Sequence, residues 1–423
     1  MTILKHYDQI VRCNRCGFCQ EACPVFRVTG HESGVARGRL ALLRAIIEDR
    51  LDWSPELEEP LFACLLCGAC TEKCFPAVET AKMLVTARTE YLDRTSRKRP
   101  HKLLFDHLLP FPERLRLAAK TVALGKRSGL SNLARALGLL RVFGRDFPRS
   151  QEIIDRFPKH AFREKVKPGI LEGRGENSRI GYFAGCGMDI ILPEAAEASI
   201  RLLGEAGKTV QVLDNCCCGL PAYAYGDLEA AKRLAIKNIE LLAAGEFDTI
   251  VTDCSSCAAF LKKYSELFDE SDVWHDKAKT VASRVRDLVE LTFLEDAPPL
   301  EEEDRIILTY HDPCHASRGQ GLVHEPRELL RAIPGAEYRE MPEADWCCGG
   351  AGAYALSHYD LSMKVLHRKM DNVEKTGANI LVTSCPACVV QLDYGIRLRQ
   401  LPVRVCHISE LLSKAKGAIS WAL

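Results

Sequence analysis

The chain of 423 residues carries 57 basic and 57 acidic residues, so its overall charge gives no reason to expect a nucleic-acid partner. Its hydrophobic share of 47% allows ordinary buried cores, and no stretch approaches the ~18–20 uninterrupted apolar residues of a membrane span. The opening residues, "MTILKHYDQIVRC", lack the basic and apolar regions of a signal peptide. We therefore expect a cytoplasmic protein of about two to four domains, attached to a membrane at most peripherally.

The 20 cysteines are the unusual feature of the composition. Cysteines of a cytoplasmic protein bind metal or react more often than they form disulfides. The first pattern among them is "CNRCGFCQEACP", which returns as "CLLCGACTEKCFP". The two runs supply Cys13, Cys16, Cys19 and Cys23, and then Cys64, Cys67, Cys70 and Cys74.

This C-x2-C-x2-C-x3-C spacing is typical of ferredoxins with two clusters, in which the fourth cysteine of each run binds the other cluster. We therefore expect two 4Fe–4S cubane clusters with crossed ligand sets. Structural zinc is a much weaker alternative, because zinc sites seldom have three CxxC steps in register. The expected sets are Cys13, Cys16, Cys19 and Cys74 for one cluster, and Cys64, Cys67, Cys70 and Cys23 for the other.

Helical periodicity surrounds these runs. Residues 38–51 and 79–92 have apolar side chains at helical spacing. Gly17 and Gly68 occupy the same place in both runs, where a side chain would crowd the sulfurs or a positive φ is required. The sequence therefore predicts an α-helical ferredoxin module over residues 1–92.

A basic helical connecting region is expected over residues 93–175. Residues 94–149 contain fourteen Lys or Arg against Asp106, Glu113 and Asp146, and residues 130–147 have a largely apolar face. Two interpretations stay open: a peripheral contact with anionic lipid or a membrane subunit, or a solvated linker packed on the next domain. The packed linker is the preferred one.

The second cysteine pattern consists of two sets of five, each a single cysteine, an adjacent pair before glycine, and a CxxC. The sets repeat at an offset of 128 to 131 residues, which indicates an internal duplication. Five thiolates with an adjacent pair suit a cluster in which one sulfur spans two irons. The sets are Cys186, Cys217, Cys218, Cys254 and Cys257, and then Cys314, Cys347, Cys348, Cys385 and Cys388.

Short β-branched runs alternate with helical segments around these cysteines. The runs "RIGYF", "TVQVLD", "TIVTD", "RIILTY" and "NILVT" predict parallel strands, with the cysteines just past their carboxyl ends. The expected fold is therefore α/β with an α-helical N-terminal part: the ferredoxin module, the connecting region, and duplicated α/β cysteine-rich domains at 176–300 and 301–423.

Together these motifs resemble the cysteine-rich "CCG" domain family. Their order is similar to that in the iron–sulfur subunits of glycolate oxidase and in the lactate-utilisation relatives, and also to that in heterodisulfide reductase. The segment "CGFCQEACPVFRVTGHESGVARGRLALL" is especially like the glycolate oxidase type. The resemblance implies that each complete five-cysteine set can hold a non-cubane 4Fe–4S cluster, up to two in all.

The remaining candidates are weaker. Cys406 is expected to be a buried apolar residue, and Cys216 is a less favoured ligand than Cys217 or Cys218. His311, Asp312 and His315 flank Cys314, where they either tune a cluster or relay protons, or only cap and turn the chain. No dinucleotide or Walker fingerprint occurs, so no flavin is expected in this chain and no catalytic residue is assigned.

The resemblance implies an electron-transfer subunit of a flavin-dependent 2-hydroxy-acid (glycolate or D-lactate) dehydrogenase. Its partner would be an FAD-containing subunit in a hetero-oligomer, with a quinone or a membrane subunit as acceptor. Two alternatives stay open. One is a heterodisulfide-reductase-like subunit that cleaves a disulfide at a CCG cluster, and the other is a quinone reductase subunit linked to an electron-transferring flavoprotein.

Overall fold

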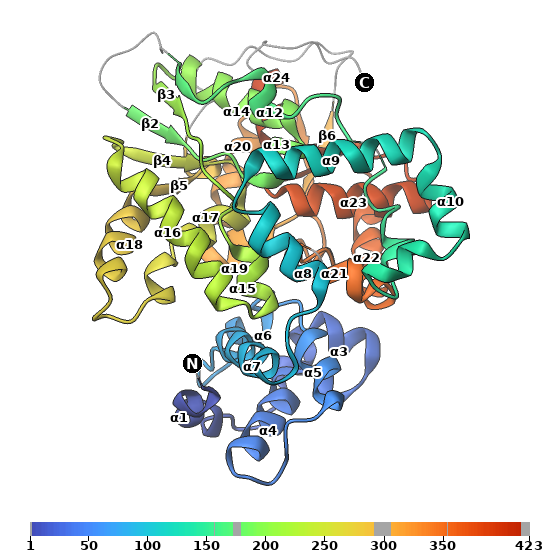
Figure 1. The fold of residues 1–423 in the computed structure, drawn as a ribbon. Helices are drawn as coiled ribbons and strands as arrows, with labels where there is room; N and C mark the ends of the chain where they lie inside the picture. The colour runs from blue at the N-terminus through green and yellow to red at the C-terminus, as the bar shows by residue number, and fades with distance from the viewer. Residues whose placement is uncertain (1, 156, 172–178, 292–305, 353, 416–423) are drawn as a thin grey trace.

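The computed structural model describes residues 2–155, 157–171, 179–291, 306–352 and 354–415. A helical N-terminal module lies at one end of the molecule, and two α/β units lie together at the other, with the connecting helices along their side (Figure 1). Among the described residues, no helix is both long and apolar enough to cross a bilayer.

The N-terminal module is built from short helices around two longer ones. The helices expected at 38–51 and 79–92 form as α4 and α7, and Leu43, Met83 and Leu84 between them are fully buried. Its elements are η1 (Ile3–His6), α1 (Tyr7–Val11), α2 (Phe18–Ala22), α3 (Pro24–Thr29), η2 (Glu32–Gly34), α4 (Ala36–Ile47), η3 (Pro55–Leu57), α5 (Glu58–Phe62), α6 (Ala69–Glu72) and α7 (Thr80–Thr95).

The glycines shared by the two cysteine runs serve the same local geometry. Gly17 precedes α2 with φ +92°, and Gly68 precedes α6 with φ +76°. Other residues adopt this left-handed conformation only at a cost, so glycine lets each cysteine loop turn directly into a helix. The expectation of a positive φ is confirmed.

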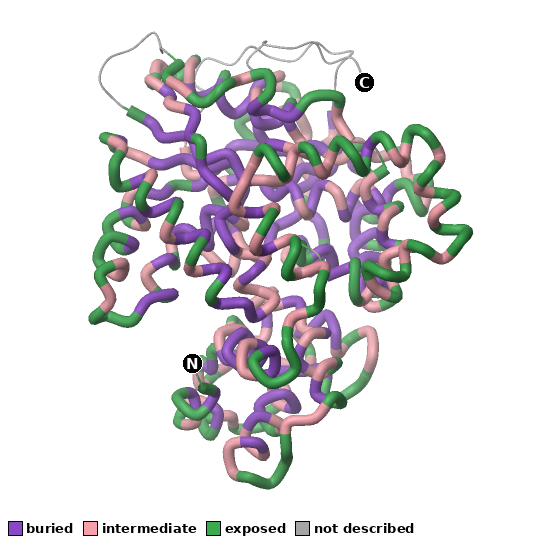
Figure 2. The backbone as a smooth tube through the Cα atoms, viewed as in Figure 1, coloured by how far each residue is buried: buried purple, intermediate pink, exposed green. Residues whose placement is uncertain are grey.

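The connecting region is helical, but much of its apolar surface is not packed. The side chains of Leu117, Val122, Leu124, Leu130, Leu133, Leu137, Leu139, Val142 and Phe143 are exposed. They belong to α9, α10, η5 and the turn between the last two, and this segment runs along the outside of the molecule (Figures 1 and 2). The elements are α8 (Arg99–Leu103), the π-helical turn η4 (Leu104–Leu108), α9 (Pro112–Arg127), α10 (Leu130–Ala136), η5 (Leu139–Phe143), α11 (Phe147–Ser150) and α12 (Phe162–Lys165).

The first α/β unit has a five-stranded sheet in the order β1-β3-β2-β4-β5. Its strand pairs are parallel except for the antiparallel edge pair β1–β3, which the sequence did not predict. The strands are β1 (Gly169–Leu171), β2 (Arg179–Tyr182), β3 (Thr209–Val212), β4 (Thr249–Thr252) and β5 (Val285–Asp287). The helices are α13 (Cys186–Ile190), α14 (Pro193–Glu205), α15 (Leu220–Tyr225), α16 (Leu228–Ala244), α17 (Ser255–Leu261), η6 (Tyr264–Leu267), α18 (Val273–Arg284) and η7 (Leu288–Glu290).

The second α/β unit has a four-stranded, wholly parallel sheet in the order β7-β6-β8-β9. Its strands are β6 (Ile307–Tyr310), β7 (Glu337–Tyr338), β8 (Ile380–Thr383) and β9 (Arg404–His407). Its helices are α19 (Cys314–Gln320), α20 (Glu325–Arg331), α21 (Tyr354–Ser357), α22 (Tyr359–Thr376), α23 (Pro386–Arg399) and α24 (Ile408–Ala415).

The two sheets share one topology, as an internal duplication requires. The order β3-β2-β4-β5 in the first matches β7-β6-β8-β9 in the second. The central register also repeats, with Ile180 opposite Thr249 in the first sheet and Leu308 opposite Ile380 in the second. The five strands that the sequence predicted are β2, β3, β4, β6 and β8.

The two α/β units are joined by packing as well as by sequence. Helix α24, at the end of the second unit, packs against α14 of the first, and Ser409 Oγ donates to the Ala195 carbonyl at 2.8 Å. The boundary expected at 92/93 lies in the last turn of α7, and those at 175/176 and 300/301 lie outside the described residues. The division into domains therefore stays a prediction.

Candidate metal centres

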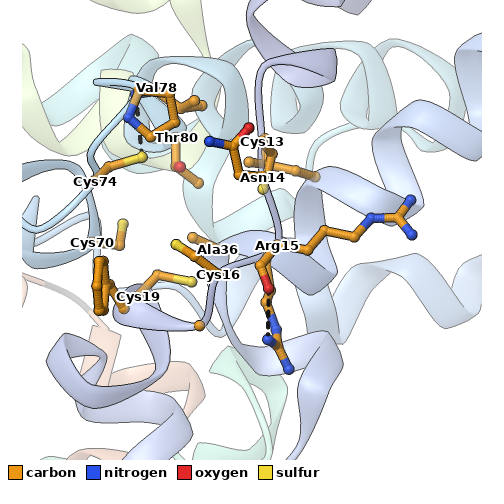
Figure 3. Close-up of a pocket in the computed structure, with 15 residues that line it drawn as sticks. Cys13, Asn14, Arg15, Cys16, Cys19, Ala36, Cys70, Cys74, Val78 and Thr80 are labelled. Atoms are coloured by element: carbon orange, nitrogen blue, oxygen red, sulfur yellow. Dashed lines mark hydrogen bonds between the residues drawn. The ribbon is translucent and has the colours of Figure 1, made fainter.

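A cavity in the N-terminal module gathers thiols from both cysteine runs. Cys13, Cys16 and Cys19 line it from the loop into α2, and Cys74 lines it from the other run, across the cavity (Figure 3). Cys70 lines the same cavity. The four thiols of the first expected set are therefore close together in space, although Cys74 comes 55 positions after Cys19 in the sequence.

The second expected set lies beside the first. Burial raises the pKa of the Cys70 thiol to about 12, and the neighbouring thiols of Cys64 and Cys23 add to this shift. Burial and the thiol of Cys64 likewise raise the pKa of Cys23. These mutual effects require the thiols to be close neighbours. Cys23 is thus a close neighbour of the second run, which is compatible with the crossed pattern, and the assignment of ligands to each cluster stays a prediction.

In the first α/β unit, the five expected cysteines converge beyond the ends of β2 and β4. The sulfurs of Cys186 and Cys217 are 3.8 Å apart. Hydrogen bonds with the thiols of Cys217 and Cys257 lower the pKa of Cys218 to about 5. Cys254 also hydrogen-bonds to Cys257, so contacts between thiols connect all five cysteines of the set.

The second α/β unit repeats this arrangement. The sulfurs of Cys348 and Cys388 are 3.5 Å apart. Hydrogen bonds with Cys314 and Cys348 hold the pKa of Cys347 well below its usual range. Those from the thiols of Cys254 and Cys388 do the same for Cys385. One of these partners, Cys254, belongs to the first unit, so the two sets are in direct contact.

The glycine of each CCG motif is fixed by the tight turn that follows the cysteine pair. Gly349 has φ +83°, and a Cβ there would lie 2.7 Å from the Ser362 carbonyl oxygen. Its counterpart Gly219 has φ +94°. The turn lets both adjacent thiols reach the same set while the chain enters a helix.

These donor sets fit iron–sulfur clusters. All 20 cysteines are free of disulfides, and most of those in the α/β units are buried. Several thiolates within contact of one another would repel strongly in a low-dielectric interior, so the sets need a positive partner. Thiolate is the ligand of iron–sulfur clusters, and a cluster takes four or more thiolates at once. Such clusters would bind at the four cysteine sets described above.

The module and the second α/β unit meet at their cysteine sets. Burial and the neighbouring thiol of Cys347 raise the pKa of Cys67. Cys23, Leu65, Trp346 and Cys347 belong to one apolar core cluster. The second set of the module is therefore adjacent to the second five-cysteine set.

Two largely buried arginines hold the module against the two α/β units, one at each unit, and no sequence pattern indicated either of them. Arg318 on α19 donates to Glu72 of the module at 2.8 Å and to the Asp345 carbonyl at 3.0 Å. Arg88 on α7 donates to the carbonyls of Cys64, at 2.8 Å, and of Ala224. In the sequence both look like ordinary solvent-facing residues of amphipathic helices.

Some candidate residues outside the two cysteine patterns have structural roles. Cys406 is buried in the core, as expected. Cys216 points its thiol at the Leu234 carbonyl and the Asn238 amide oxygen, at 3.7 and 3.4 Å. Asp312 forms a buried two-oxygen ion pair with Arg327, at 2.9 and 2.8 Å, which favours its structural interpretation.

The two histidines lie against the cysteine sets. His315 Nδ1 is 3.9 Å from Cys314 Sγ and 3.1 Å from Ser256 Oγ of the first unit. A ring nitrogen of His311 and the sulfurs of Cys348 and Cys388 all lie within 4.8 Å of one another. For these two histidines, a role beside a cluster is therefore better supported than one in capping or turning the chain.

Family models match most of this architecture. A 4Fe-4S dicluster domain matches residues 9–77, and a cysteine-rich (CCG) domain matches residues 180–262 and 308–393. The linker region of the glycolate oxidase iron-sulfur subunit matches residues 96–150. The fold and the cysteine sets thus define an iron–sulfur protein with a dicluster module and two cysteine-rich domains.

Similar proteins extend over the whole chain. The probable glycolate oxidase iron-sulfur subunit of Bacillus subtilis (strain 168) is 33% identical over 97% of this chain and 94% of its own length. The glycolate oxidase iron-sulfur subunit of Escherichia coli (strain K12) is 28% identical over 91% of this chain and 90% of its own. A fumarate reductase (CoM/CoB) subunit of Methanothermobacter marburgensis is 34% identical over 60% of this chain and 50% of its own. The chain belongs to the glycolate oxidase iron–sulfur subunit family.

The crossed arrangement of thiols in the module makes a direct prediction. Cys23→Ser should remove the same paramagnetic signal as Cys64→Ser, because both side chains face one cluster. Cys74→Ser should remove the same signal as Cys13→Ser. Electron paramagnetic resonance of the four reduced variants, each with its iron content measured, checks this. Loss of one signal in both Cys23→Ser and Cys13→Ser would show that each run binds its own cluster.

Proposed function

We propose that the chain is the electron-transfer subunit of a flavin-dependent 2-hydroxy-acid dehydrogenase, with glycolate or D-lactate as the substrate of the complex. Its partner is an FAD-containing subunit, and the acceptor is a quinone or a membrane subunit. The observation that carries this proposal is that the four cysteine sets form one continuous series through the chain.

The series follows from thiol contacts at three junctions. Cys70 of the second module set also lines the cavity of the first. Cys67 is a neighbour of Cys347 in the second cysteine-rich domain. Cys385 then contacts Cys254 of the first cysteine-rich domain. In this order of contacts the second five-cysteine set comes between the sets of the module and the first five-cysteine set, although it is last in the sequence. The first domain also packs on the module, where Arg88 donates to the Ala224 carbonyl.

This chain's chemistry and that of its partner are complementary. Iron–sulfur clusters bound at these sets supply one-electron transfer. Removing a hydride from the C–H bond of a hydroxy acid needs a flavin or a nicotinamide instead. Because the sequence contains no dinucleotide fingerprint, the oxidation of the substrate is assigned to the partner.

Disulfide cleavage is the second candidate function. Both five-cysteine sets are complete and in contact through Cys254 and Cys385, so this region could present two clusters to one substrate. The similarity to the fumarate reductase (CoM/CoB) subunit is compatible with this alternative. A subunit linked to an electron-transferring flavoprotein is a third arrangement, and the partner that co-purifies distinguishes the three.

The connecting region supplies a surface suited to a membrane acceptor. Large apolar side chains are exposed along α9, α10 and η5, where the preferred interpretation had them packed on the next domain. On α10, Leu130 and Leu133 lie on one helical face, which Leu137 continues just beyond the helix end. The exposed Arg127, Arg141 and Arg145 lie beside them in sequence. An apolar face with flanking arginines binds the surface of an anionic bilayer. We therefore assign this surface, residues 117–145, to peripheral membrane attachment.

The cluster count can be measured directly. Protein prepared anaerobically should contain about sixteen irons and as many acid-labile sulfides, four for each of four cysteine sets. Iron and sulfide analysis of the purified chain checks the number. About eight irons would mean that the cysteine-rich domains hold no four-iron clusters.

The relay can be tested with the flavoprotein partner. Without the partner, the flavin-free chain should not oxidise any 2-hydroxy acid. With partner and substrate, stopped-flow absorbance should show reduction of the module in the Cys347→Ser/Cys348→Ser variant, whereas reduction of the acceptor should be lost. Cys406→Ser, which alters a buried cysteine outside the sets, is the matched control and should keep both steps. Turnover by the chain alone, or unimpaired acceptor reduction in the double variant, would contradict the relay.

Membrane attachment can be tested with lipid vesicles. The chain should sediment with vesicles containing phosphatidylglycerol, less so as salt increases, and little with phosphatidylcholine alone. Leu130→Ser/Leu133→Ser/Leu137→Ser should reduce binding several-fold. Val273→Ser removes an equally exposed apolar side chain on α18 and should leave binding unchanged. Equal binding by the triple variant and the wild type would show that this surface has another role.

A further inference from the structure

The two cysteine-rich domains differ at one position beside their cysteine sets. Phe183 and His311 are equivalent, because each follows the first central strand of its sheet and precedes the first cysteine by three residues. The backbone N–H of Phe183 donates to the Val251 carbonyl at 2.8 Å. That of His311 donates to the Val382 carbonyl at 2.9 Å. The duplicated backbone thus presents a phenyl ring in one domain and an imidazole in the other.

His311 is buried without a hydrogen-bond partner for its ring. Its exposure is 1%, and neither ring nitrogen has a partner among the described residues. The Ala344 carbonyl next to the ring already accepts from the Asp312 N–H and from Lys369 Nζ, both at 3.0 Å. Buried imidazoles rarely remain unpaired, because an N–H removed from water needs an acceptor.

The open side of this imidazole faces the second cysteine set. One ring nitrogen and the sulfurs of Cys348 and Cys388 all lie within 4.8 Å of one another. In either protonation state the ring carries at least one N–H, and the sulfurs of a cluster accept hydrogen bonds. A cluster bound by this set therefore provides the partner that the imidazole lacks.

The two domains also differ at a second position, near the loop before the adjacent cysteine pair. Lys369, which is fully buried, donates to the carbonyls of Glu343 and Ala344 at 2.7 and 3.0 Å, in the loop before Cys347. The equivalent residue of the first domain is the neutral Asn238, which donates to the Cys217 carbonyl at 3.0 Å. At these two equivalent positions the second set therefore has a lysine and an imidazole where the first has an amide and a phenyl ring. The first set has a buried cation elsewhere, because Arg163 donates to the carbonyls of Ala184 and Asn215.

We propose that His311 donates a hydrogen bond to a sulfur of the cluster held by the second five-cysteine set, and that this hydrogen bond raises the reduction potential of that cluster. Hydrogen bonds to sulfur and nearby positive charge stabilise the reduced, more negative state of a cluster. His311 is thus a tuning residue that makes the duplicated sites unequal. The inference rests on the proposed binding of clusters by both domains.

The experiment measures the reduction potential of the second-domain cluster in the purified chain, by titration followed with electron paramagnetic resonance. His311→Phe, which installs the residue of the first domain, should lower this potential at unchanged iron content. His311→Gln keeps an N–H donor and should restore most of the shift. Phe183→Leu, a matched apolar change beside the other set, should leave it unchanged.

Pulsed resonance provides a second readout, independent of the potential. The wild type should show a weak nitrogen coupling to the second-domain cluster that disappears in His311→Phe. An unchanged potential at full iron content overturns the proposal while cluster binding stands. A coupling as strong as that of a directly bonded nitrogen overturns it in favour of a histidine ligand. Absence of iron from the second domain overturns both the inference and the proposed function.

Discussion

The charge of crowded thiols is the constraint on which the rest of this structure depends. Within each five-cysteine set the thiols shift one another's acidity in opposite directions: the pKa of Cys347 is held down, whereas that of Cys388 is raised. Such opposition arises when close thiols hydrogen-bond to one another, because the accepting sulfur is then favoured as thiolate and the donating one as thiol. Iron offsets several thiolates at once, so metal binding and the stability of these loops are expected to be coupled. This also explains the adjacent pair Cys217 and Cys218, whereas the neighbouring Cys216 directs its thiol to Leu234 and Asn238.

The same constraint explains why the domains pack as they do. Parallel sheets bring the cysteines to the carboxyl ends of their strands, and the tight turns at Gly219 and Gly349 let adjacent thiols face one site. The two cysteine-rich domains then meet at Cys254 and Cys385, and the module meets the second domain at Cys67 and Cys347. These junctions between parts of the chain are thus also junctions between cysteine sets. That arrangement suits transfer of electrons through the chain more than separate binding functions.

Cysteine spacing and strand–helix alternation were sufficient to predict the order of the parts, the parallel strands and the convergence of each cysteine set. These features are local in sequence or repeat at a fixed offset. The edge strand β1 was missed because its pairing with β3 is antiparallel and depends on a distant partner. The roles of Arg88 and Arg318 were missed because their partners are backbone carbonyls and side chains of other domains, which no local pattern encodes. The exposure of apolar side chains in the connecting region was not expected, because an apolar face in a sequence does not show whether another part of the chain covers it.

The central claim is that four clusters lie in series, with the cluster of the second five-cysteine set between those of the module and that of the first five-cysteine set. Anomalous diffraction at the iron edge, from crystals grown anaerobically, tests this most directly, because it locates iron without any assumption about ligands. The account predicts four iron centres, the third of them beside Cys314, Cys347 and Cys388 and flanked by the centres near Cys67 and Cys254. Iron confined to the module, or a module centre closer to the iron of the first five-cysteine set than to that of the second, would contradict it.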